Sequence, residues 1–287
     1  MRQKKYLVAL VCLAFGFADA FACAGCMALY DTPVPASVTG DNVRTYIDRN
    51  ADARFWFSAP NRVSVYNADS NRSDLRKSGT YRIVYEYGVP FIHFAWDAHT
   101  SPRTIGTRFL ILRNEEFMLL YNSNTEPAFR ALHGMGWHGL YESESTWATE
   151  TLTMGHLHFD ATPGRLGTHI NRVWAVEGGV GERLFIGGWS RHMVLSIGYV
   201  HFTRPYLFQA NSRPKRLRIL QGHNHTQYFE VELEDTPHYQ TINIPTTEDW
   251  GWWVWDHGLV IEILEIRPGF RYNHMCINSI MWIIDGW

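Results

Sequence analysis

Hydrophobic and polar residues alternate along much of this chain with the period of two that is typical of β-strands. In the first half, one stretch has a large apolar residue at every second position, namely Tyr81, Ile83, Tyr85 and Tyr87. A continuous apolar run over 91–96 predicts a strand that is buried on both faces. The runs 109–112 and 117–121 flank a polar turn and predict a hairpin. We therefore expect an antiparallel barrel-like or curved-sheet domain here, preceded by a short helix over 42–50.

The second half shows short apolar runs that are separated by turn residues. Gly134, Gly136 and Gly139 interrupt the pattern and place a domain boundary between 134 and 144. No sustained helical period follows, which is typical of an all-β sandwich. Its predicted strands are 193–197, 216–220, 228–233, 239–244, 259–266 and 277–284. We expect an all-β protein with one β-rich domain at 27–142 and a β-sandwich at 143–287.

Length and composition fit two ordinary globular domains. The chain has 287 residues, of which 46% are hydrophobic and 19% are charged. A formal net charge of −2 argues against disorder and against broad nucleic-acid binding, which needs a basic face. The local basic cluster at 213–218 is typical of a solvated strand face. We therefore expect no nucleic-acid partner.

Residues 1–26 have the pattern of an export signal. Basic residues precede an apolar run that is too short to span a bilayer as a helix. Small residues follow, and cleavage after Ala20 or Ala22 suits a signal peptidase. Cys26 is a candidate lipidation site, and Cys23 is a second one. We expect a periplasmic, outer-membrane lipoprotein or secreted location, with a lipid anchor as the only membrane attachment. The alternative is an uncleaved anchor.

A series of turn motifs organises the C-terminal half. The motifs are Trp174-x-x-Glu177-Gly178 with Gly181-Glu182, Gly198-Tyr199, Asn211-Ser212-Arg213-Pro214-Lys215 and Glu234-Asp235-Thr236-Pro237. In this order and spacing they resemble the glycan-binding or translocation domain of bacterial NAD glycohydrolase toxins. That domain is a relative of the discoidin-like (coagulation factor type C-like) sandwiches. The resemblance covers about half of the chain and implies a galactose-binding-like β-sandwich from residue 143 onwards.

The resemblance implies a binding module. The NAD-cleaving domain of those toxins has no visible counterpart in this sequence, so no hydrolysis is implied. Asn171-Arg172 and Asn273-His274 stand where the family favours acidic residues, and calcium prefers carboxylate ligands. We therefore expect no metal ion and no cofactor. The expected partner is carbohydrate or another cell-surface or envelope ligand.

Sugar rings stack their apolar faces on aromatic side chains, while polar side chains bind the hydroxyl groups. The candidates for such a site are Trp174, Glu177, Tyr199, Asn211, Arg213, Trp252 and Trp253. The alternative for the tryptophans is core packing, because large aromatic residues are mostly buried. The alternative for Glu177, Asn211 and Arg213 is stabilisation of their own loops.

Metal and nucleophile chemistry lack a complete set of residues. The pairs His156/His158 and His223/His225 have a spacing that metals use, yet no third ligand is evident. No Gly-x-Ser-x-Gly elbow is present, and Cys276 beside an apolar strand is typical of inert packing. We therefore predict no catalytic residues and an exported, non-catalytic binding protein.

Two other functional classes stay open. One is an enzyme whose catalytic site lies in the N-terminal domain, with the sandwich as a targeting module. Asp97, His93 and His99, near the end of a predicted strand, are its candidate residues. The other is a structural envelope protein that docks a protein partner through a tryptophan-rich face.

Overall fold

The computed structural model describes most of the chain between residues 44 and 284. The described segments are 44–48, 53–58, 61–67, 75–98, 106–114, 117–124, 129–132, 139–142, 145–148, 166, 169–170, 173–187, 192–221, 227–245 and 258–284. Several predictions fall outside them: the export signal with Cys23 and Cys26, both histidine pairs, His99, Trp252 and Trp253. Within these segments, no helix is both long enough and apolar enough to cross a membrane.

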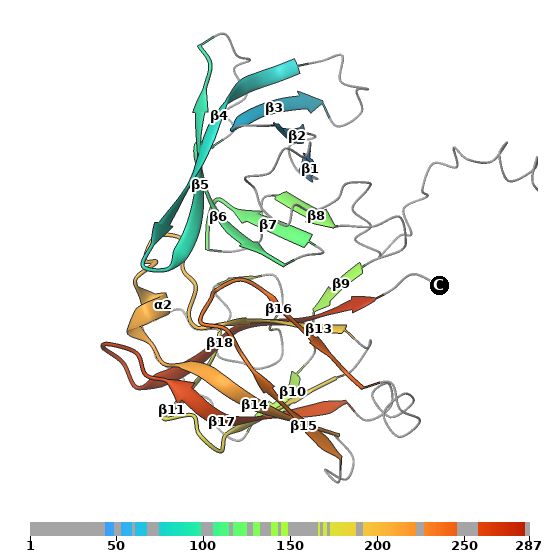
Figure 1. Ribbon diagram of the computed structural model, residues 1–287, viewed down its shortest axis with the longest axis vertical. Helices are drawn as coiled ribbons and strands as arrows, with labels where there is room; N and C mark the ends of the chain where they lie inside the picture. The colour runs from blue at the N-terminus through green and yellow to red at the C-terminus, as the bar shows by residue number, and fades with distance from the viewer. Residues whose placement is uncertain are drawn as a thin grey trace, which may run out of the picture.

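The N-terminal half forms an antiparallel barrel (Figure 1). Its described strands are β1 (Arg44–Asp48), β2 (Ala53–Ser58), β3 (Arg62–Asn67), β4 (Leu75–Glu86), β5 (Val89–Trp96), β6 (Arg108–Arg113), β7 (Phe117–Tyr121) and β8 (Phe129–Leu132). Each strand pairs with the next, and β1 closes the barrel by pairing with β8. The barrel-like prediction is confirmed, and so is the hairpin of β6 and β7.

The helix expected over 42–50 is wrong. Residues 44–48 form strand β1, which pairs with β2 from Arg44 opposite Phe57 to Asp48 opposite Ala53. Thr45 and Ile47 are β-branched, a type that favours strands. Pairing with a neighbouring strand overrides a weak local helix preference.

The C-terminal half is a sandwich of two antiparallel sheets, which confirms the all-β prediction. The far sheet has the order β10 (Ser145–Ala148), β12 (Arg183–Ile186), β17 (Leu259–Arg267), β14 (Arg213–Gln221), β15 (Tyr228–Glu232). The barrel-side sheet has the order β11 (Trp174–Glu177), β18 (His274–Ile284), β13 (His192–Ile197), β16 (Gln240–Asn243). The six strand runs predicted for this half correspond to β13 to β18.

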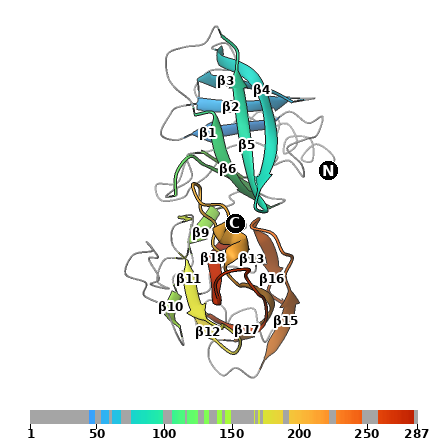
Figure 2. The same cartoon turned by 90° about the vertical axis from the view of Figure 1, so that its left-hand side faces the viewer.

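Strand β9 (Gly139–Glu142) adds to the barrel-side sheet beside β18. It pairs from Glu142 opposite Met281 to Gly139 opposite Ile284. The sandwich therefore includes residues that precede the domain start expected at 143. Figures 1 and 2 show the barrel stacked on the sandwich, with β9 on the side of the sandwich that faces the barrel.

Alternation along β11 and β18 separates two apolar layers. Trp174 and Val176 point into the core between the sheets, together with Met275 and Ile277. Ala175 and Cys276 belong to a second cluster on the opposite face, which also contains Leu207 of the short helix α2 (Leu207–Ala210). Helix α2 therefore covers part of the outer face of the barrel-side sheet, next to the turn between β4 and β5 (Figure 1).

The barrel contacts the sandwich along a seam, by which we mean the contacts of β5 and β6 with the loop 201–204 and with β16. On one side, the Tyr239 amide N–H donates to the Arg113 carbonyl at 2.9 Å, and the Tyr239 ring lies 4.9 Å from the ring of Phe117. Asn114 Nδ2 donates to Thr241 Oγ1 at 3.1 Å. These contacts attach the end of β6 to strand β16.

The other side of the seam is built on Arg108 of β6. Its guanidinium carbon lies 3.7 Å from the Phe91 ring centroid and 4.9 Å from that of Phe202. The same group donates to the Phe202 carbonyl at 3.2 Å and to both carboxylate oxygens of Glu86 at 3.1 and 3.0 Å. A cation placed between two rings and paired with a carboxylate holds this side of the seam together.

Candidate functional site

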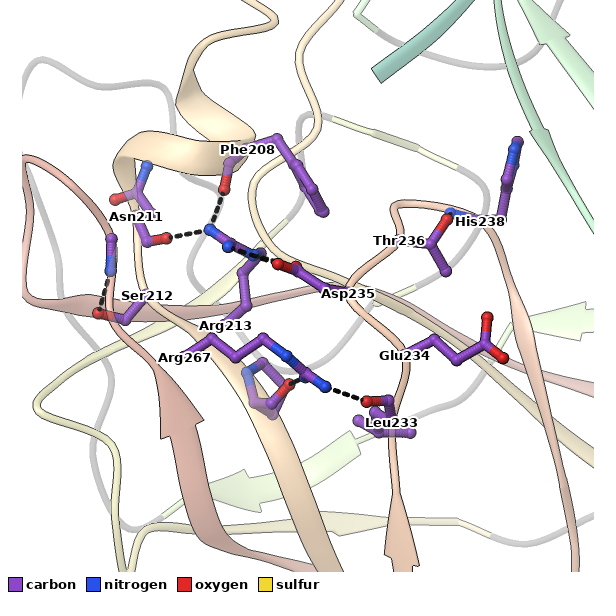
Figure 3. Close-up of polar contacts among 12 residues, drawn as sticks. Phe208, Asn211, Ser212, Arg213, Leu233, Glu234, Asp235, Thr236, His238 and Arg267 are labelled. Carbon is purple, nitrogen blue, oxygen red and sulfur yellow. Dashed lines mark hydrogen bonds and ion pairs between the residues drawn. The ribbon is translucent and has the colours of Figure 1, made fainter. Parts of the chain in front are cut away.

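Arg213, the first residue of β14, is buried beneath α2 and bonds through all three guanidinium nitrogens (Figure 3). Nη1 donates to the carbonyls of Phe208 and Asn211 at 2.8 and 2.9 Å. Nε and Nη2 donate to the two carboxylate oxygens of Asp235 at 2.7 and 3.1 Å. Carbonyls at the C-terminal end of a helix lack intrahelical partners. Arg213 therefore provides hydrogen-bond donors for carbonyls at the end of α2 and connects this helix end to the turn at Asp235.

Three neighbours complete this arrangement. Asn211 Nδ2 donates to the Leu207 carbonyl at 2.9 Å, and Ser212 Oγ accepts from the Gly269 amide at 3.2 Å. Arg267 donates to the carbonyls of Pro214 and Leu233. We call Asn211, Ser212, Arg213, Asp235 and Arg267 the clamp. Its polar groups bind each other and the backbone around α2, so they fix the loops that carry the neighbouring surface.

Four predicted ligand residues are buried in the structure. Trp174 is fully buried between the two sheets, and Tyr199 is 3% exposed beneath α2. Burial raises the pKa of Tyr199 to about 12. Asn211 and Arg213 belong to the clamp and are 2% and 6% exposed. Core packing for Trp174 and loop stabilisation for Asn211 and Arg213, the alternatives noted above, describe their observed contacts.

Glu177 differs from those four, because it is exposed at the end of β11. Its cross-strand partner is His274 of β18. The next residue, Gly178, has a φ of +72° and donates its amide to the Asn273 carbonyl at 3.0 Å. The predicted Trp-x-x-Glu-Gly motif thus lies beside the loop between β17 and β18.

Aromatic side chains from distant parts of the chain gather around α2. Tyr87, in the turn between β4 and β5, is 57% exposed, and its ring lies 6.2 Å from that of Tyr206 in an edge-on arrangement. Phe270 is 66% exposed, and its amide donates to the Gln209 carbonyl at 3.1 Å. The Tyr272 amide donates to the carbonyl of Ala210, the last residue of α2, at 2.8 Å. The loop between β17 and β18 is therefore fixed against α2.

Polar side chains lie among these rings. The His274 ring stacks on Tyr272 at 6.1 Å with an interplanar angle of 2°, and the Arg271 guanidinium lies 5.1 Å from the Tyr272 ring. Across the described segments, no hydrogen bond or ion pair uses the side chains of Glu177, Gln209 or Arg271. We call the following set the α2 surface: Tyr87, Glu177, Tyr206, Gln209, Phe270, Arg271, Tyr272 and His274.

A small apolar cluster supports this surface from below. It contains Tyr199, Leu207 and Cys276, and the rings of Tyr206 and Tyr272 pack against it. Cys276 is fully buried in this cluster, and burial raises the pKa of its thiol. Tyr199 therefore contributes to the surface as a support rather than as a contact residue.

Sequence reasoning missed the aromatic residues of the α2 surface. The available signal was the Phe270-Arg271-Tyr272 run directly after the predicted turn at 267–269. Large apolar residues in a polar turn are exposed unless another element covers them. Tyr87 and Tyr206 carry no comparable signal, because only the fold brings them together.

The candidates for an enzymatic site have separate structural partners. Asp97 accepts from Ser78 Oγ at 2.6 Å and from Arg62 Nη2 at 2.9 Å, and these bonds lower its pKa. His93 lies at the seam beside Arg108 and Glu86. No contact joins Asp97 to His93 in the described segments. The same segments contain no group of three His, Cys, Asp or Glu side chains that could hold a metal ion.

The basic cluster at 213–218 is neutralised by carboxylates, as expected of a solvated strand face. Lys215 and Arg216 pair with Glu265 at 3.0 and 2.7 Å. Arg218 pairs with Glu230 and Glu262, each at 3.0 Å. These side chains form a paired charge network on the far sheet, well separated in the fold from the α2 surface.

A comparison with known protein families finds no family that matches this chain, and a comparison with curated proteins finds no match either. The resemblance to the toxin glycan-binding domain therefore stays a prediction from the motif series, and the structure supports the all-β fold alone.

Proposed function

We propose that this protein is an exported, non-catalytic binding protein that recognises carbohydrate through the α2 surface. One observation carries the proposal: aromatic rings lie beside polar side chains (Glu177, Gln209 and Arg271) that make no hydrogen bond or ion pair in the described segments. Sugars present apolar faces and hydroxyl groups together, so they need both kinds of group at one place. The α2 surface offers both, whereas the clamp offers neither.

The composition of the α2 surface favours a sugar over a protein partner. Glu177 and Gln209 offer hydroxyl-binding oxygens, and Arg271 and Gln209 offer donors. Carboxylates are depleted in the cores of protein interfaces, where desolvation is costly. A sugar hydroxyl replaces the lost water hydrogen bond directly, so an exposed carboxylate beside aromatic rings suits a glycan better.

Export and anchoring are part of the same proposal. The pattern of residues 1–26 supports transfer across a membrane, and Cys26 is the proposed lipidation site. The barrel supplies Tyr87, so both halves of the chain contribute to the proposed site.

The test is glycan-array binding of the purified full chain, with and without a chelator. We expect binding that survives the chelator, because the α2 surface contains no described metal site. Changing Tyr272 to Ala should weaken binding by about tenfold or more, since a stacked ring is lost. The control is Tyr228→Ala on β15, where a more exposed ring lies on the far sheet. Equal effects of the two changes, or no binding by folded protein, would refute the proposal.

A protein-docking role is the second candidate. The 66% exposure of Phe270 favours it, because exposed aromatic residues anchor many protein interfaces. Co-purification of a stoichiometric protein partner that Tyr272→Ala abolishes, together with an empty glycan array, would support this role instead. Turnover of NAD or of a glycoside by the full chain would support the enzymatic alternative.

A further inference from the structure

Three histidines lie along the seam between the barrel and the sandwich. His93 belongs to β5 of the barrel, His201 to the loop before α2, and His238 to the turn before β16. Each is next to a residue or group that makes a seam contact: Arg108, Phe202 and Tyr239, respectively. Their protonation states therefore bear directly on how the two halves hold together.

His201 accepts hydrogen bonds that require an unprotonated Nδ1. The backbone amides of Thr203 and Arg204 lie 3.3 and 3.1 Å from this atom, and an amide N–H can only donate. The resulting turn carries Phe202, whose ring and carbonyl contact Arg108 and whose amide donates to Asn124 at 2.7 Å. A proton on Nδ1 would remove the acceptor and set N–H against N–H.

His238 has a buried Nδ1 without a hydrogen-bond partner. Figure 3 shows its ring turned away from the clamp. The charged group that acts on it from the barrel is Arg113, whose carbonyl binds the Tyr239 amide. The nearby carboxylate of Asp235 is already held by Arg213. A proton on His238 would add a second positive charge at the docking point of β16.

His93 has the same features on the opposite side of the seam. Its Nε2 is buried without a hydrogen-bond partner and lies 4.0 Å from Glu86. Arg108 and Arg82 oppose a positive charge on the ring, while Glu86 favours one. Both oxygens of Glu86 are engaged by Arg108, so this carboxylate is shared rather than free.

The direction of the pKa shifts agrees with this geometry. Burial, followed by the charge of Arg204, lowers the pKa of His201 to about 4, and burial, followed by Arg113, lowers the pKa of His238 to about 4. Burial, followed by Arg108, lowers the pKa of His93. A free histidine titrates near pH 6.5, so the docked state binds fewer protons than the open state. The seam is therefore fully stabilised above pH of about 6.5 and loses stability as the pH falls toward about 4.

We propose that the seam is an acid-sensitive contact: protonation of His201, His238 and His93 separates the barrel from the sandwich while each half keeps its strands. Separation moves Tyr87 away from Tyr206, and it exposes Phe91 and Phe202, which pack on Arg108. The inference concerns the seam alone and does not depend on what the α2 surface binds.

The test measures the radius of gyration of the full chain by small-angle X-ray scattering from pH 7.5 to pH 4, with far-UV circular dichroism on the same samples. We expect the radius to rise while the strand signal is retained. The double variant His201→Asn and His238→Leu should move the midpoint of this rise to lower pH by about half a unit or more. Asn provides an oxygen acceptor for the two amides but does not titrate, and Leu removes an unpaired nitrogen.

His274→Asn is the matched control, because it removes a histidine of β18 whose ring contact is with Tyr272 in the sandwich. It should leave the midpoint unchanged. If the double variant is unfolded at pH 7.5, His201→Asn alone serves, with a smaller shift in the same direction. Three results would overturn the proposal: a constant radius down to pH 4, a rise that coincides with loss of the strand signal, or an unchanged midpoint in the variants.

Discussion

The clamp and the α2 surface both adjoin the same short helix, and they use their polar groups in opposite ways. Arg213 donates hydrogen bonds to the Asp235 carboxylate and to backbone carbonyls at the end of α2. Glu177, Gln209 and Arg271 have no side-chain hydrogen bond or ion pair in the described segments. Only the second group has capacity left for a ligand, because a buried and fully bonded group cannot rebind without breaking its present bonds.

This difference assigns separate roles to residues that look alike in sequence. Arg213 and Arg271 are both arginines in turn-rich loops of the sandwich. One is 6% exposed and holds α2 in place, and the other is exposed above the Tyr272 ring. Substitutions in the clamp should therefore act on stability, and substitutions in the α2 surface should act on binding.

The largest effect is expected from Arg213→Met. The change leaves the Phe208 and Asn211 carbonyls and the Asp235 carboxylate without their partner. The Asp235 side chain is 45% exposed, so most of the expected loss of about 3 kcal/mol of unfolding free energy comes from the two carbonyls that lose a buried donor. Urea denaturation of the full chain measures the loss. Arg216→Met is the control, because its ion pairs are solvent-exposed and are worth less than about 1 kcal/mol.

A loss of less than about 1 kcal/mol in Arg213→Met would contradict the clamp as a stabilising unit. In that case Arg213 would return to the set of ligand candidates, as the sequence first suggested. Binding data on the same variant separate the two readings. A stable protein that no longer binds glycan places Arg213 in the site itself.

Gly198→Ala tests how closely α2 is held against the barrel-side sheet. Gly198 has a φ of +79°, and an added Cβ would lie 2.6 Å from Cδ2 of Phe208 and 3.1 Å from Cδ of Arg213. Backbone strain of about 1 kcal/mol then adds to a steric clash of about 1–2 kcal/mol, so we expect a loss of about 2–3 kcal/mol. Thermal or urea unfolding gives the value.

Gly178→Ala is the matched control for this change. Its φ of +72° is nearly the same, but nothing lies within 4 Å of the added Cβ. Only the strain of about 1 kcal/mol should remain. Equal losses in the two alanine variants would show that the contact between Gly198 and Phe208 does not hold α2 in place.

The strands were predictable from the sequence, while the site was not. In runs such as 259–266 and 277–284, apolar residues either alternate with polar ones or are continuous. These two patterns correspond to strands buried on one face or on both faces, so the strands can be recognised from the local sequence. Strands β1, β2 and β8 to β12 were not predicted, and Trp174–Glu177, which the sequence analysis took as part of a turn motif, is strand β11. The conformation of β1, for example, is set by pairing with β2 rather than by its own pattern. Cross-strand partners decide the structure of such short segments.

The clamp and the α2 surface depend on contacts between residues that are far apart in the chain. Arg213 meets Asp235 across a turn and two strands, and Tyr87 meets Tyr206 across the seam. No local periodicity marks such pairs. A polar residue in a predicted loop therefore has the same sequence pattern whether its side chain is buried and hydrogen-bonded or exposed to solvent. The motif series marks loops that lie near α2, and it does not distinguish the side chains that face outward from those that are buried.

The smallest change in stability is expected from Glu177→Gln, which separates binding from folding at the edge of the α2 surface. Glu177 is exposed, and its side chain has no partner in the described segments, so the unfolding free energy should change by less than about 0.5 kcal/mol. A charged acceptor binds a hydroxyl more strongly than an amide does by about 1 kcal/mol, so glycan affinity should fall about fivefold. Titration of the best array ligand into wild type and variant measures it. Glu232→Gln on the far sheet, also exposed, should leave affinity unchanged; an equal loss there would mean that general surface charge, and not the position of Glu177 beside His274, attracts the ligand.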